Sequence, residues 1–148
     1  MDLTHLTQLD GKCICFVKGG EHFSLALSSD GSVYAWGRSD QGQLGRLVED
    51  KAGSFDPQPQ KIVLPPVSQV YPGSSHVLAV TRSGHVYSWG FGEMFQLGHG
   101  ESATSSGGYG SHLDQPAPKR IEAFNNESVF RVSAGAQHSC VLVGRPLQ

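Results

Sequence analysis

Three histidines of this 148-residue chain share the local pattern Gly-x-x-His. The pattern occurs at Gly19–His22, Gly73–His76 and Gly135–His138, and each copy leads into an apolar segment. An imidazole side chain can exchange protons near neutral pH, form hydrogen bonds and bind metal ions. Because the three copies recur, the rings also fit a structural task, in which each bridges backbone groups at the start of a strand. Both interpretations stay open for each histidine.

No motif for bond-making chemistry accompanies these histidines. The sequence lacks GxSxG, HExxH and GxxxxGK[ST], the patterns of α/β-hydrolases, zinc proteases and phosphate-binding loops. Its three cysteines, Cys13, Cys15 and Cys140, have no zinc-type spacing and are expected to be reduced thiols. We therefore expect no cofactor, no metal site and no bond-making enzyme.

Charge and hydropathy exclude two further classes of partner. Eleven basic side chains stand against 13 acidic ones, so the chain has no cluster of positive charge for a nucleic-acid backbone. The sequence has no signal peptide and no apolar run of about 20 residues that could span a membrane. We expect a soluble intracellular protein that contacts neither nucleic acid nor membrane directly.

A long internal repeat supplies the framework for the histidines. Gly31–Gly45 (GSVYAWGRSDQGQLG) and Gly84–Gly98 (GHVYSWGFGEMFQLG) are identical at eight of 15 positions and begin 53 residues apart. A period near 50 residues is typical of propellers and solenoids. In both copies a tyrosine alternates with a tryptophan, Trp36 or Trp89, which we expect to pack between adjacent repeat units. The glycines that follow, Gly37 and Gly90, indicate turns or close packing.

Short apolar runs between glycine-rich turns predict an all-β fold. The ten predicted strands are Ile14–Lys18, Phe23–Ser28, Ser32–Gly37, Gln60–Val63, Ser68–Tyr71, His76–Thr81, His85–Gly90, Lys119–Glu122, Phe130–Ser133 and Ser139–Val143. The turns that contain Gly31 and Gly84 predict two antiparallel hairpins. The glycine- and serine-rich segment 99–115 is expected to be a flexible surface loop.

The order of these motifs resembles the repeat of the regulator of chromosome condensation family. Gly-x-x-His, Leu-Ala-Leu or Leu-Ala-Val, Asp-Gly or Ser-Gly, Val-Tyr-x-Trp-Gly and Gln-Leu-Gly follow one another at the family's spacing over nearly the whole chain. The resemblance implies a seven-bladed β-propeller of four-stranded blades. This chain supplies about two and a half blades, in units of approximately 13–66, 67–128 and a partial 129–148. We expect one partial propeller domain, which either is a fragment or assembles with other copies or a longer propeller chain.

The resemblance also implies a function. It is strongest to the C-terminal third of the family's guanine nucleotide exchange factors for the Ran-type GTPase. The residue matching His22 is implicated in exchange there, the one matching His138 lies on the GTPase-binding face, and no role carries over to His76. Because the earlier blades are missing, exchange by this chain alone is in doubt. The alternative is a protein-interaction module built from the same repeats. The resemblance implies the nucleus and chromatin, with the cytoplasm as the other possible location.

Overall fold

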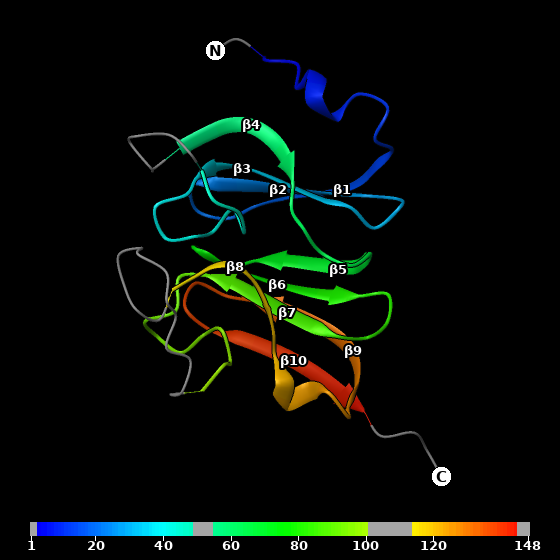
Figure 1. The fold of residues 1–148 in the computed structure, drawn as a ribbon, viewed down its shortest axis with the longest axis vertical. Helices are drawn as coiled ribbons and strands as arrows, with labels where there is room; N and C mark the ends of the chain where they lie inside the picture. Colours follow the sequence, from blue (N-terminus) through cyan, green and yellow to red (C-terminus); the bar gives the residue numbers. More distant parts are fainter. Residues whose placement is uncertain (1–2, 49–54, 101–113, 145–148) are drawn as a thin grey trace.

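The structure is a computed structural model that describes residues 3–48, 55–100 and 114–144. These residues form three antiparallel sheets, which Figure 1 shows stacked one on another from the N-terminal to the C-terminal end. Two three-residue 3₁₀ helices, η1 (Thr7–Leu9) and η2 (Glu122–Phe124), lie outside the sheets. The arrangement is the predicted partial β-propeller, and we call the sheets blades 1, 2 and 3.

Blades 1 and 2 have four strands each, and each strand pairs with the one that follows it in the chain. Blade 1 consists of β1 (Ile14–Gly19), β2 (Phe23–Ser28), β3 (Val33–Arg38) and β4 (Phe55–Lys61). Blade 2 consists of β5 (Val67–Pro72), β6 (His76–Thr81), β7 (Val86–Gly90) and β8 (Gln115–Arg120). Blade 3 consists of β9 (Ser128–Ala134) and β10 (Ser139–Gly144). The all-β fold and two and a half blades are thereby confirmed.

The two return strands begin earlier than predicted. The sequence predicted Gln60–Val63 and Lys119–Glu122, whereas β4 begins at Phe55 and β8 at Gln115. Each strand therefore includes two prolines, which in the prediction only flanked it. Proline is tolerated because β4 and β8 are edge strands of their sheets. On its outer side an edge strand has no neighbouring strand to pair with, so the backbone N–H that proline lacks is not needed there. Most of the predicted loop 99–115 lies outside the described residues, and its last residue belongs to β8.

Both predicted hairpins are present. β2 pairs with β3 and β6 with β7, and the turns between them hold Gly31 and Gly84 at φ values of +89° and +88°. A side chain is strained at such angles, which explains the glycines. At Gly31 the space is also closed, since a methyl group there would lie 2.8 Å from the backbone nitrogen of Val67.

The hydrophobic core lies between the blades. One cluster joins blade 1 to blade 2 and contains Leu25, Leu44, Val77 and Trp89, all fully buried. A smaller cluster joins blade 2 to blade 3 around Leu78 and Val132. Each sheet thus buries a face against the next one, as the repeat pattern predicts.

The two repeat tryptophans lie in different surroundings. Trp89 is fully buried, and its indole Nε1 donates a hydrogen bond of 3.2 Å to the carbonyl oxygen of Gln43 in blade 1. Trp36 is only half-buried, because it lies on the face of blade 1 that is not covered by blade 2. Among the described residues, this repeat position therefore contributes to an interface between blades at Trp89 and not at Trp36.

This contrast predicts different stabilities for two matched variants. Trp89→Ala removes a fully buried side chain between two sheets and is expected to lower the free energy of unfolding by about 3–5 kcal/mol. Trp36→Ala removes a half-buried ring and should cost less than half as much. Urea unfolding followed by circular dichroism measures both, and equal losses would contradict an interface role specific to Trp89.

Candidate functional site

The predicted histidine motifs all lie at one end of the stacked sheets, in the turns β1–β2, β5–β6 and β9–β10. Each turn is closed by one backbone hydrogen bond. The amide of Gly20 donates to the carbonyl of Phe23 at 2.9 Å, and those of Gly73 and Gly135 donate to His76 and His138 at 2.8 and 2.9 Å. In each turn the ring packs directly over its glycine, where a methyl group would collide with it. The glycine is therefore required by the ring that covers it.

These contacts correct the predicted register of the first motif. The structural equivalent of His76 and His138 is Phe23, not His22, because Phe23 pairs with Gly37 as His76 pairs with Gly90. The equivalent glycine is Gly20, whereas Gly19 is the last residue of β1. Because Gly19 and Gly20 are adjacent, the repeat can be aligned in two registers. Aligning it on His22 gives the wrong one.

His22 consequently occupies a different place from the other two histidines. It aligns with Ser75, because their carbonyl oxygens accept equivalent hydrogen bonds of 2.9 Å, from the amides of Arg38 and Phe91 respectively. By the same alignment its counterpart in blade 3 is Gln137. Different side chains at this position are compatible with the same turn, so the fold does not require an imidazole there.

His76 has a structural environment. It is fully buried, and its Nε2 lies 3.0 Å from the hydroxyl of Ser139 in blade 3. That hydroxyl in turn donates to the carbonyl oxygen of Gln96 at 2.7 Å. Burial, together with the nearby His138, lowers the pKa of His76 to about 4. The ring is therefore neutral at physiological pH and links blade 2 to blade 3.

His22 lines a polar cleft of about 290 Å³, which we call the rim cleft. All three blades contribute to it, and its lining residues are Glu21, His22, Arg38, Gln41, Ser74, Ser75, Phe91, Ala136 and Gln137. The His22 side chain is 56% exposed, and its Nε2 lies 3.7 Å from the Glu21 carboxylate. The amide of Glu21 donates to the Ser74 carbonyl at 3.0 Å, which fixes the turn of blade 1 against that of blade 2.

The charges of the rim cleft are partly paired. Arg38 Nε donates to the Asp40 carboxylate at 2.7 Å, and Gln43 donates to the same carboxylate at 3.3 Å. Partial burial opposes ionisation of Asp40, but these hydrogen bonds outweigh it and lower its pKa below the usual range. Asp40 is therefore charged at neutral pH and holds Arg38. Glu21 and His22 are left at the opening of the cleft as exposed groups that a partner can reach.

The structure does not bring the predicted site residues into one cluster. His138 is exposed but lines a second cleft, between blades 2 and 3, together with Gln137. Gly37 and Gly90 pack against the turns β1–β2 and β5–β6, so they support the rim without lining it.

No three His, Cys, Asp or Glu side chains among the described residues come together as a metal site requires. No helix in the described part of the chain is long and apolar enough to cross a membrane.

Sequence reasoning missed Glu21, Arg38 and Gln41. The signal for them was the difference between the repeats. Where blade 1 carries Arg38, blade 2 carries Phe91, although the preceding Trp-Gly is common to both. Polar residues at points where the repeats diverge are not required by the common fold, and this marks them as candidates for binding.

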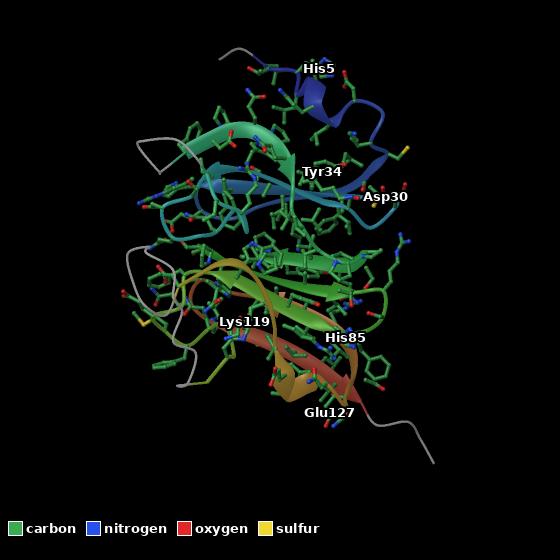
Figure 2. The ribbon with its side chains drawn as sticks, in the orientation of Figure 1. His5, Asp30, Tyr34, His85, Lys119 and Glu127 are labelled. Atoms are coloured by element: carbon green, nitrogen blue, oxygen red, sulfur yellow. The ribbon has the colours of Figure 1, made fainter. Side chains whose placement is uncertain are left out.

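The opposite end of the stack has a different character. Figure 2 shows Asp30 and His85 at the hairpin turns β2–β3 and β6–β7, away from the rim cleft. The Asp30 carboxylate accepts hydrogen bonds from Ser28 and Ser32, which lower its pKa to about 2. His85 lies within 3.2 Å of Ser83 in the same turn. These polar groups are occupied within their own turns.

Comparison with known proteins identifies the repeat. The family model described as "Regulator of chromosome condensation (RCC1) repeat" matches residues 30–80 and 83–142. Protein RCC1 of Candida albicans is 35% identical over 94% of this chain, and the ultraviolet-B receptor UVR8 of Arabidopsis thaliana is 36% identical over 94%. The matches span 31% and 29% of those two proteins, so the chain corresponds to less than a third of either.

A solved structure has the same fold. The crystal structure of Prp20p from Saccharomyces cerevisiae superposes with a TM-score of 0.77 at 33% identity, over 90% of this chain and 32% of that one. Prp20p is described as binding Gsp1p and histones. The likeness supports the assignment of the sheets to propeller blades.

The buried His76 predicts a pH-dependent stability. Because its pKa is about 4 in the folded state and 6.5 when unperturbed, the unfolded chain binds a proton between these values and the folded chain does not. Stability is fully present above about pH 6.5 and falls as the pH is lowered toward 4. His76 alone should cost roughly 2 kcal/mol between pH 7 and pH 5.

His76→Phe tests this expectation, because Phe23 fills the same position in blade 1. Urea unfolding at pH 7 and pH 5 should show a weaker pH dependence in this variant than in the wild type. Some dependence should persist, since burial and the nearby Lys119 also lower the pKa of His99 to about 4. His5→Phe, at an exposed site, is the control. An unchanged pH dependence in His76→Phe would show that the ring is not held neutral.

Proposed function

The chain belongs to the family of proteins built from the regulator of chromosome condensation (RCC1) repeat, and on this basis we propose that its blades bind a Ran-type GTPase and contribute to guanine nucleotide release. The binding surface in this proposal is the rim cleft with the adjacent His138. The relative Prp20p supports it, because Prp20p is described as binding Gsp1p. The chain would act as part of the exchange surface, since it spans less than a third of its relatives.

The exposed His22 is the observation that carries the proposal. Its counterparts Ser75 and Gln137 show that the turn does not need a histidine, and the ring is 56% exposed beside Glu21. A side chain that the fold neither requires nor buries is free to contact a partner. His76, which performs a structural task, has no part in the proposed surface.

Nucleotide exchange requires no covalent chemistry from these residues. An exchange factor binds the nucleotide-free GTPase more tightly than the loaded one, and by linkage it weakens nucleotide binding by the same factor. An imidazole can contribute by a hydrogen bond to a displaced segment of the GTPase. Glu21, 3.7 Å from His22, can hold the ring or interact with a basic group of the partner.

The proposed partner also suggests where the chain works. A protein that acts on a GTPase at chromosomes is found in the nucleus, and we include this location, with the cytoplasm as the alternative. Attachment to DNA by the chain itself is not part of the proposal, because its 11 basic and 13 acidic side chains give no net positive charge.

A second candidate function is a protein-interaction module without exchange activity. The observation that favours it is the relative UVR8, which is named as an ultraviolet-B receptor although its identity of 36% is similar to the 35% of protein RCC1 of Candida albicans. In this case the rim cleft would bind a partner protein and leave nucleotide release unchanged. Assembly with a longer propeller chain or with other copies is compatible with either function.

Nucleotide release distinguishes the two functions. We expect the chain to accelerate release of a fluorescent guanine nucleotide from a loaded Ran-type GTPase, and His22→Ala to reduce the acceleration about fivefold or more. His138→Ala should reduce it less. His85→Ala, in a hairpin turn at the opposite end, is the matched control and should leave it unchanged.

Binding without acceleration, in samples that circular dichroism shows to be folded, would favour the interaction module. If the GTPase neither binds nor responds, both the partner and the activity are wrong. Equal acceleration by the wild type and His22→Ala would support exchange activity but show that His22 is not part of the GTPase-binding surface.

A further inference from the structure

The hairpin turns β2–β3 and β6–β7 share a backbone conformation but differ in the residue before the glycine. Gly31 and Gly84 have nearly equal φ values of +89° and +88°, and each amide donates to the carbonyl three residues earlier, at 3.0 and 2.9 Å. The residue before the glycine is Asp30 in blade 1 and Ser83 in blade 2. Ser83 therefore occupies a place that holds a carboxylate in the equivalent turn.

The turn of blade 1 is arranged to hold a negative charge. The Asp30 carboxylate accepts hydrogen bonds from the Ser28 hydroxyl and, at 2.9 Å, from the Ser32 amide. These hydrogen bonds lower the pKa of Asp30 to about 2, and the positive charge of Lys61 acts in the same direction. Donors that lower the pKa of a carboxyl group stabilise its charged form.

The turn of blade 2 keeps the same donors but has no charged acceptor at this place. The hydroxyl of Thr81, which is the counterpart of Ser28, lies 2.9 Å from the Ser83 hydroxyl. The His85 amide, which is equivalent to that of Ser32, donates to the Thr81 hydroxyl oxygen at 3.0 Å. The Ser83 hydroxyl also lies 3.2 Å from Nδ1 of His85, so the imidazole adds a further group that can donate.

Two arginines add positive charge to this turn and the strand beside it. Arg82 directly precedes Ser83 and is exposed. Arg120 of β8 is the counterpart of Lys61 of β4, since each pairs with the tyrosine of its own repeat. Nε of Arg120 is buried without a hydrogen-bond partner in the described part of the chain. A phosphate group has three strong acceptor oxygens and pairs well with arginine, so it suits this set of donors.

The turn that contains Ser83 is accessible. A methyl group at Gly31 would lie 2.8 Å from the backbone nitrogen of Val67, whereas one at Gly84 would meet no described atom within 4 Å. The turn of blade 1 is therefore packed against the next blade, and that of blade 2 is not packed in this way against the described part of blade 3. An exposed turn without such packing can open locally, so that an enzyme can reach its side chains.

We propose that Ser83 is a phosphorylation site and that the β6–β7 turn holds the phosphoserine as the β2–β3 turn holds Asp30. A protein kinase transfers the γ-phosphoryl group of ATP to the Ser83 oxygen. The bond to the β-phosphate breaks, ADP leaves, and the hydroxyl proton passes to the catalytic aspartate of the kinase. The phosphate oxygens then accept hydrogen bonds from the Thr81 hydroxyl, the His85 amide and the Arg82 guanidinium.

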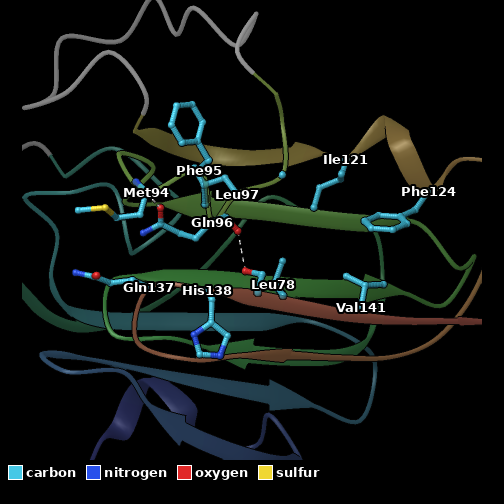
Figure 3. A pocket seen from close by; sticks show the side chains of 12 residues that line it. Leu78, Met94, Phe95, Gln96, Leu97, Ile121, Phe124, Gln137, His138 and Val141 are labelled. Atoms are coloured by element: carbon cyan, nitrogen blue, oxygen red, sulfur yellow. Dashed lines mark hydrogen bonds between the residues drawn. The ribbon is translucent and has the colours of Figure 1, made fainter.

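The phosphorylation site is separate from both clefts. Ser83 lines neither the rim cleft nor the cleft between blades 2 and 3, where Figure 3 shows Gln137 and His138. Figure 1 shows the β6–β7 turn on the opposite side of the sheets from the β5–β6 turn. The proposal therefore does not depend on GTPase binding.

Enzymatic phosphorylation of the intact chain tests whether Ser83 is accessible to a kinase. The enzyme is a serine/threonine kinase chosen because it phosphorylates a peptide of residues 77–87, VLAVTRSGHVY, at its only serine. We expect this kinase and ATP to phosphorylate Ser83 in the folded chain, as located by tandem mass spectrometry, and Ser83→Ala to lack that phosphate. A folded chain in which Ser83 remains unmodified would overturn the proposal.

A chain with phosphoserine incorporated at position 83 tests whether the turn holds the phosphate. In a ³¹P NMR titration the folded chain should bind the second phosphate proton at least about threefold more weakly than the phosphopeptide does, because the donors of the turn stabilise the dianion. Thr81→Val removes one donor and should reduce this difference. Thr7→Val, at an exposed site in η1, is the matched control and should leave it unchanged.

A further measurement does not depend on these variants. Hydrogen exchange of the His85 amide should be slower in the phosphorylated wild type than in the unmodified chain, because the amide then donates to a charged acceptor. A phosphate that titrates as it does in the peptide, or a His85 amide that exchanges at an unchanged rate, would show that the turn does not hold the phosphoserine. Thermal unfolding verifies that each variant is folded.

Discussion

Burial of each sheet against the next is the constraint on which this structure depends. A single four-stranded sheet of these repeats has an apolar face that only a neighbouring sheet covers, and the core is therefore distributed between blades. The Trp89 indole shows how this is done, since it belongs to blade 2 but rests on Gly45 and donates to Gln43 of blade 1. The position of every blade is set by the one beside it, and so is the position of each turn on the rim.

The distribution of the core explains why the fold could be predicted and where prediction failed. Glycine turns and alternating apolar residues identified all ten strands because both follow from local backbone and burial requirements. The starts of β4 and β8 were missed because a proline is compatible with a strand only at an edge, and edges are defined by the assembled sheet. Which strands lie at an edge is not a local property of the sequence.

The histidines illustrate the same limit at the level of the site. His22 and His76 share a sequence motif, yet Phe23 is the residue that pairs and packs as His76 does. A tandem glycine permitted both alignments, and only the pairing with Gly37 distinguishes them. The correction matters for function, because a histidine that recurs for structural reasons is a poor candidate for binding, and His22 is not one of these.

Repeats separate structural from functional residues in a way that a single domain does not. Positions that agree between blades, such as Gly37 and Gly90 or the Gln-Leu-Gly segments, serve the fold in both. Positions that differ at equivalent places, such as His22, Ser75 and Gln137, or Arg38 and Phe91, are not needed by it. Their chemistry is then available for partners. Equivalence between blades thus identifies the surface that the fold leaves free.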